Sequence, residues 1–180
     1  MTVAVSLQNL VDELQMLPNE GTAYLHKVSG RIITVTDDDV AMVEMDSEFE
    51  KEFEEEMEGI NDEIGGENLD WEIQHFQDVK RILAEDADYL ELPSRFDINE
   101  YEIMERFCLS IPNGRVREVL LQKIRGSGAF RRFKDTIYQY GIENDWFQYR
   151  DEAYKEFAVA WLDSEGIAYD DDVNRQEHSE

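Results

Sequence analysis

The sequence predicts a mainly helical α+β protein, with an N-terminal helix and β-hairpin followed by a helical domain of about five helices. Three observations predict this class. Apolar residues recur at helical spacing over most of the chain after residue 70. Two short alternating runs flank a Ser-Gly pair, as in a hairpin. An acidic stretch separates the two regions. The expected divisions are 1–36 for helix and hairpin, 37–70 for an acidic connector, 71–169 for the helical domain and 170–180 for a polar tail.

The N-terminal part is expected to be one helix and one hairpin. Residues 5–17 carry apolar side chains at helical spacing, and Pro18 ends the pattern. Two strands, 22–28 and 31–36, would be joined by a two-residue turn, because Gly30 supplies the positive φ that such turns need. The alternation places four side chains on one face: Tyr24, His26, Ile33 and Val35. A sheet this small needs a helix to cover it.

The connector is defined by its charge. Residues 37–70 contain sixteen Asp or Glu and one base, Lys51. Carboxylates at helical spacing repel one another, and three glycines interrupt the run. We therefore expect a solvated, mobile connector that acts as a hinge.

Five helices are expected after the connector, over 70–83, 99–111, 115–125, 129–140 and 144–165. Asp70 is expected to cap the first, and Asp97 or Asn99 the second. Glycines that end helices follow the later ones. A short extended piece is expected at 89–92. The expected buried faces include Trp71 in the first helix and two phenylalanines, Phe130 and Phe133, in the fourth.

Composition excludes several classes of protein. The chain has 180 residues, 42% of them apolar, and a formal net charge of −26. No apolar run approaches 18 residues, so no membrane span is expected. Cys108 is the single cysteine and the N-terminus lacks a signal-peptide pattern, which favours the cytoplasm. The acidity disfavours nucleic acids and anionic membranes as partners, because phosphates are repelled.

A basic island interrupts the acidity. Residues 115–134 hold seven Lys or Arg against Glu118 alone. The island brackets a Gly-Ser-Gly loop that opens a helix, where unpaired amides and the helix dipole favour anions. We therefore expect an anion or partner site in this loop and beside it. Its candidate residues are Arg125, Gly126, Ser127, Gly128, Arg131, Arg132 and Lys134, with Arg95 as a more distant member.

Simpler interpretations of these residues remain open. A Gly-Ser-Gly loop also suits any junction between helices, and its cations could be solvated or face an acidic segment of the same or another chain. Arg95 could pair with acids at the start of its helix, where Ser94 or Asp97 would satisfy loose amides. Nucleic acid is disfavoured further because the rings that could stack on its bases, Phe130, Phe133 and Tyr138, are expected in the core.

No residue pattern indicates catalysis, a cofactor or a metal site. Glu72 and His75 have the Glu-x-x-His spacing of a di-iron helix, but the chain has no second copy, so His75 is expected at the surface. Cys108 is expected to be a buried apolar residue. Motifs for phosphate-binding loops, dinucleotides and serine nucleophiles do not occur.

Two strings carry a family resemblance: Leu-Pro-Ser-Arg-Phe-Asp-Ile at 92–98 and Arg-Gly-Ser-Gly-Ala-Phe-Arg-Arg-Phe-Lys-Asp at 125–135. With Trp146, Tyr-Arg-Asp-Glu-Ala at 149–153 and Trp161-Leu162, they resemble an uncharacterised bacterial protein family of unknown function. The resemblance runs from Tyr24 to Gly166. It implies a small cytosolic bacterial protein and no particular chemistry.

The leading hypothesis is a non-enzymatic binding or regulatory protein that engages an anionic group at the basic loop. The anion would belong to a small ligand or to a protein partner. A homodimer that pairs the connector of one chain with the basic island of another is a further option. The alternatives are an enzyme acting on a phosphorylated small molecule and an acidic mimic of nucleic acid that captures a basic partner.

Overall fold

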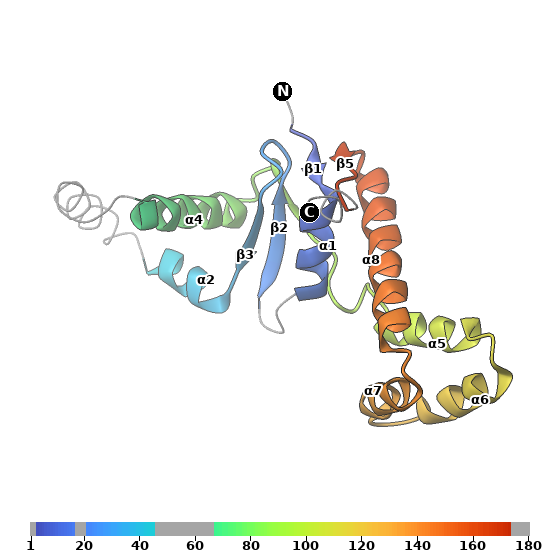
Figure 1. Ribbon diagram of the computed structural model, residues 1–180. Helices are drawn as coiled ribbons and strands as arrows, with labels where there is room; N and C mark the ends of the chain where they lie inside the picture. The colour runs from blue at the N-terminus through green and yellow to red at the C-terminus, as the bar shows by residue number, and fades with distance from the viewer. Residues whose placement is uncertain (1–2, 17–20, 46–66, 174–180) are drawn as a thin grey trace. The chain divides into compact units, whose positions relative to one another are not determined.

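The computed structural model describes residues 3–16, 21–45 and 67–173 (Figure 1). These residues form seven helices and five short strands, which confirms the mainly helical α+β class. The chain divides into two compact units, which are described separately. The first comprises Met1–Ser6 and Met16–Leu92, and the second comprises Leu7–Gln15 and Pro93–Glu180.

The first unit is built on a three-stranded antiparallel sheet. Its strands are β2 (Thr22–His26), β3 (Ile32–Val35) and β4 (Tyr89–Glu91), in the order β3-β2-β4. A two-residue strand, β1 (Val5–Ser6), also belongs to this unit. Because β4 pairs with β2, the units divide at residue 92, whereas composition placed the start of the helical domain at 71.

The hairpin turn is longer than expected. The His26 amide donates to the Arg31 carbonyl at 2.8 Å, so these two residues flank a four-residue turn, 27–30. Gly30 closes it with φ +72° and donates its amide to the His26 carbonyl. The two-residue turn was therefore wrong. The register differs from it by two residues, so Tyr24, His26, Ile33 and Val35 still share one face.

The start of the expected connector is a helix, α2 (Asp37–Glu44). The Thr36 hydroxyl accepts from the Asp39 amide, and the Asp39 carboxylate accepts from the Thr36 amide at 2.7 Å. This capping box and the acidic first turn favour a helix despite the like charges. The expectation of a mobile connector was wrong for 37–44 and for 67–70, which are helical, and for 46–66 it lies outside the described residues.

Helix α4 (Glu67–Leu83) covers the sheet together with α2 (Figure 1). Asp70 lies inside α4, so it is not the cap that was expected. Trp71 is 58% exposed, and the buried face is formed further along the helix. The core of the unit comprises Tyr24, Ile33, Val35, Val40, Val43, Val79, Ile82 and Tyr89.

The second unit contains five helices and a two-residue strand. The elements are α1 (Leu7–Met16), α5 (Glu100–Ser110), α6 (Gly114–Lys123), α7 (Ala129–Tyr140), α8 (Glu143–Glu165) and β5 (Tyr169–Asp170). The helices expected after the connector and the extended piece at 89–92 are all present, with ends that differ by a few residues. Asn99 caps α5 by accepting from the Glu102 amide.

Aromatic rings form the core between α5, α7 and α8. Phe107, Phe133 and Trp146 meet edge to face, with centroids 4.8 to 6.0 Å apart. This geometry suits the quadrupoles of the rings. Helix α1 joins α8 through Gln15, whose side-chain oxygen accepts from Arg150 at 3.0 Å.

The buried face of α7 differs from the expected one. It carries Ala129, Phe133, Thr136 and Ile137. Phe133 is in the core as predicted, but Phe130 is 41% exposed and Tyr138 is 76% exposed. With Ala129 and Thr136 on the buried face, Phe130 and Tyr138 lie on sides of α7 that face solvent. The placement of these two rings in the core was therefore wrong.

Candidate functional site

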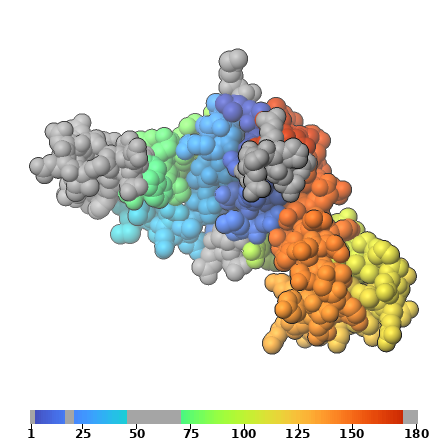
Figure 2. All heavy atoms as spheres, viewed as in Figure 1, coloured from blue at the N-terminus to red at the C-terminus, as the bar shows by residue number. Residues whose placement is uncertain are grey.

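The basic corner is the loop between α6 and α7 together with the first two turns of α7. Gly126 and Gly128 adopt left-handed conformations, with φ of +75° and +74°. That conformation is costly for residues with a Cβ, which explains a Gly-x-Gly sequence at a sharp junction. Helices α6 and α7 pack side by side at this corner (Figure 2).

Arg132 holds the loop in place. Its Nε donates to the Lys123 carbonyl at 2.9 Å. Its two terminal nitrogens donate to the carbonyls of Ser127 and Arg125, each at 2.6 Å. One guanidinium thus satisfies three carbonyls that the end of α6 and the loop leave unpaired. Sequence reasoning expected Arg132 to face an anion, whereas its fork is directed at the backbone.

The other cations of the corner point toward solvent. Arg125, Arg131 and Lys134 are exposed, as is Ser127. Within the described ranges, none of the ion pairs involves Arg125, Arg131 or Lys134. The corner therefore combines a loop fixed by Arg132 with three exposed positive charges, an arrangement suited to contact with an anionic group.

Arg95 occupies a different part of the second unit. It precedes α5, and its positive charge acts on the hydroxyl of Tyr154. That hydroxyl donates to Glu100 at 2.7 Å. The pKa of Tyr154 is raised, mainly by burial and secondly by this hydrogen bond. The neighbouring turn is closed by Asp97, which accepts from the amide and hydroxyl of Ser94 at 2.8 and 2.6 Å. Asp97 thus satisfies the Ser94 amide in the turn before the helix, while a helix amide that it was expected to cap, that of Glu102, bonds Asn99.

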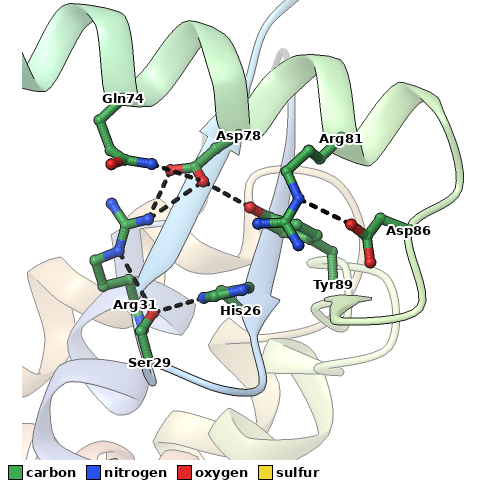
Figure 3. Close-up of polar contacts among 8 residues, drawn as sticks. All are labelled: His26, Ser29, Arg31, Gln74, Asp78, Arg81, Asp86 and Tyr89. Carbon is green, nitrogen blue, oxygen red and sulfur yellow. Dashed lines mark hydrogen bonds and ion pairs between the residues drawn. The ribbon is translucent and has the colours of Figure 1, made fainter.

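A second polar group of residues lies in the first unit (Figure 3). Asp78 on α4 is 1% exposed. Its carboxylate accepts from Arg31 Nη2 at 2.8 and 3.2 Å and from the Tyr89 hydroxyl at 2.6 Å. A buried carboxylate needs such partners, because transfer from water is costly unless charge and hydrogen bonds are compensated. The three residues come from α4, the hairpin and β4.

His26 extends this network toward the turn. Its Nδ1 lies 2.7 Å from the Ser29 hydroxyl oxygen, and its ring lies 4.7 Å from that of Tyr89 (Figure 3). An imidazole beside a hydroxyl is a component of nucleophilic sites. Here, however, the nearby carboxylate of Asp78 bonds Arg31 and Tyr89, so it does not orient the imidazole. The arrangement ties the turn, the sheet and α4 together.

Sequence reasoning missed Asp78. The signal was an aspartate next to Val79 within an otherwise apolar stripe, but acidic residues are so frequent in this chain that one more did not stand out. Its partner Arg31 lies on the sheet face shared with His26, and the His26 amide bonds the Arg31 carbonyl at the end of the hairpin.

The remaining candidates were Cys108 and His75. Cys108 is buried as expected, and burial raises the pKa of its thiol to about 11, which disfavours the reactive thiolate. His75 was expected at the surface, but it is half-buried with Nε2 3.2 Å from an oxygen of Asp39. In the described part of the chain, no three His, Cys, Asp or Glu side chains are grouped so as to hold a metal.

The same part of the chain contains no helix long and apolar enough to cross a membrane. Comparison with known proteins found no match among curated proteins or solved structures. One family model matches, described as an uncharacterised protein family (UPF0158), over residues 63–178. The resemblance was expected to begin at Tyr24, so the hairpin lies outside the matched region. Since the match covers more than half of the sequence, the chain belongs to the uncharacterised protein family UPF0158.

Proposed function

We propose that this chain is a non-enzymatic binding protein that engages an anionic group of a ligand or protein partner at the basic corner. The observation that carries the proposal is that the arginines of the corner have two different environments. Arg132 bonds three carbonyls of the loop, while Arg125 and Arg131 beside it are exposed. A loop that is already ordered loses little entropy on binding, which favours recognition.

The charge distribution supports the same role. Residues 115–134 carry a net charge of 7 − 1 = +6 within a chain of −26. At physiological ionic strength, charges more than about 8 Å apart are largely screened. An anion at the corner therefore responds mainly to the local cations, while the rest of the surface repels anions.

Location and assembly are part of the proposal. A single buried cysteine suits a reducing cytoplasm, and the resemblance of the signature strings favours a bacterial source. A homodimer in which the acidic residues of one chain meet the basic corner of another is the simplest assembly. Sedimentation at low salt should then show a dimer that dissociates as salt is raised.

The test is a thermal shift measured at fixed ionic strength with sulfate, phosphate and polyphosphate as probes. A probe at about 100 times its dissociation constant should stabilise the protein by about 2.7 kcal/mol. The Arg125→Ala/Arg131→Ala double variant should lose this shift. Arg106→Ala is the control, because Arg106 is also an exposed arginine of the second unit but lies outside residues 115–134.

A saturable shift that the double variant lacks and the control keeps would support the proposal. Equal shifts in all three proteins would indicate nonspecific screening and would overturn it. The absence of a shift with every anion would also overturn it, since the corner would then be a solvated junction between helices.

A further inference from the structure

The exposed face of α7 carries two aromatic rings with two basic side chains between them in the sequence. Lys134 lies four residues after Phe130, three after Arg131 and four before Tyr138, spacings that place all three residues beside it on a helix. All four are exposed, and Tyr138 is 76% exposed. We call these four residues the α7 patch. The helical rise places the two rings about 12 Å apart along the axis, with Lys134 between them.

The core of the unit does not account for this pattern. Ala129, Phe133, Thr136 and Ile137 form the buried face of the same helix. A helix whose outward face needed only solubility would carry charged or small polar residues, whereas the α7 patch keeps two rings in contact with water. Arg125, in the loop before α7, adds a third exposed cation near the start of the patch.

We infer that the α7 patch binds single-stranded nucleic acid, with bases stacked on Phe130 and Tyr138 and phosphates paired with Arg125, Arg131 and Lys134. This inference rests on the proposed function and names its anionic partner. Exposed rings alternating with cations are the general chemistry of single-strand recognition, because every base offers a π-face and every nucleotide a phosphate. Nucleic acid was disfavoured because Phe130 and Tyr138 were expected to be buried, and their exposure removes that objection.

The negative charge of the whole chain works against this partner at long range. Screening limits that repulsion to nearby groups, and residues 115–134, which lead into the patch and contain part of it, carry a net charge of 7 − 1 = +6. Asp135 is the carboxylate closest in sequence to Arg131 and Lys134, and it is exposed on the adjoining side of α7. Removing the negative charge of Asp135 should therefore strengthen the binding of nucleic acid, whereas removing a cation should weaken it.

An acidic polypeptide is the competing partner. It would match the cations equally well, but its apolar side chains bind best in grooves that enclose them. The α7 patch lies on the outward face of a single helix, where flat rings stack on flat bases without enclosure. The aromatic residues therefore favour nucleic acid, and substituting them distinguishes the two partners.

The experiment is fluorescence anisotropy of the full chain with a labelled oligothymidylate of about 15 nucleotides, a length that spans one such site. Tyr138→Ala should weaken binding about 5-fold or more. Tyr138→Phe keeps the ring and should bind like wild type. Trp71→Ala removes an exposed ring from the other unit and should also leave binding unchanged. The slope of log K against log salt should be about −2 for three phosphate contacts.

Asp135→Asn should tighten binding, and circular dichroism of each variant checks that α7 stays folded. If Tyr138→Ala binds as tightly as wild type, stacking does not occur and the inference is wrong. If the oligonucleotide does not bind while polyphosphate or polyglutamate does, nucleic acid is the wrong partner although the proposed function stands. If none of these polyanions binds, the inference and the proposed function fail together.

Discussion

The hydroxyl of Tyr89 donates a 2.6 Å hydrogen bond to the carboxylate of Asp78, and both side chains are buried. This bond joins β4 to α4 inside the first unit. Arg31 reaches the same carboxylate from the hairpin, so one acidic group links the sheet to the helix that covers it. The first unit is small, and a buried charge with several partners specifies how its elements pack.

Asp78→Asn should destabilise the first unit by about 2 kcal/mol, because it removes the charge that Arg31 and Tyr89 both need. Hydrogen exchange of the amides in β2 and β3 measures the loss locally. Asp88→Asn is the matched control, since Asp88 is half-exposed and lies 3.5 Å from Arg81. A surface pair of this kind contributes little. Equal protection in the two variants would show that Asp78 does not hold the unit together.

Tyr89→Phe should change how stability depends on pH. Burial and the bond to Asp78 raise the pKa of Tyr89 from 10 to about 12. An unfolded chain would lose this proton near pH 10, while the folded chain keeps it to about pH 12. The stabilisation is therefore complete below pH 10 and is lost as pH rises from 10 to 12. Urea unfolding across this window should fall less steeply for Tyr89→Phe than for wild type, and identical slopes would contradict the assignment.

The helices of the second unit could be predicted from sequence because their signals are local. Apolar spacing, Asn99 at a cap and glycines after helices each act within a few residues. The helix at 37–44 was missed for a related reason. The prediction considered charge repulsion over the whole connector, whereas the Thr36–Asp39 capping box stabilises the start of this helix within one turn.

The candidate sites depended on information that is not local. Arg131 and Arg132 are adjacent in sequence, and nothing local distinguishes them. Only Arg132 bonds the Lys123 carbonyl at the end of α6. The face of α7 that is buried is set by Phe133, which packs against Phe107 of α5 and Trp146 of α8, and this leaves Tyr138 exposed. Sequence located the basic corner, but tertiary packing determined which of its side chains face solvent.

Arg132→Lys should destabilise the corner by about 1 to 2 kcal/mol, because an ammonium cannot reproduce the three-way bonding of a guanidinium. Amides over 123–129 should exchange faster with solvent. Arg131→Lys keeps an exposed charge and should leave both the stability and the exchange unchanged. If the two variants behave alike, the hydrogen bonds of Arg132 do not order the loop.

Cys108 should resist alkylation while the protein is folded. Burial raises the pKa of its thiol to about 11, so at pH 8 very little thiolate forms and access is closed. Mass spectrometry after iodoacetamide treatment should show unmodified native protein and complete modification in concentrated urea. Rapid labelling of the native protein would mean that α5 opens locally and exposes its buried face.

The two glycines of the corner should respond differently to alanine. Both have left-handed backbones, so each substitution costs about 1 kcal/mol in conformational strain. At Gly126 a Cβ meets no atom within 4 Å, whereas at Gly128 it lies 3.1 Å from Arg132 Nη1. Gly128→Ala should therefore also displace the guanidinium and lose its bond to Ser127. Thermal unfolding should show a larger loss for Gly128→Ala than for Gly126→Ala. Adding Arg132→Ala to each variant should remove the difference, because the displaced group is then absent. A difference that persists in the Arg132→Ala background would place its cause in the backbone rather than in the arginine.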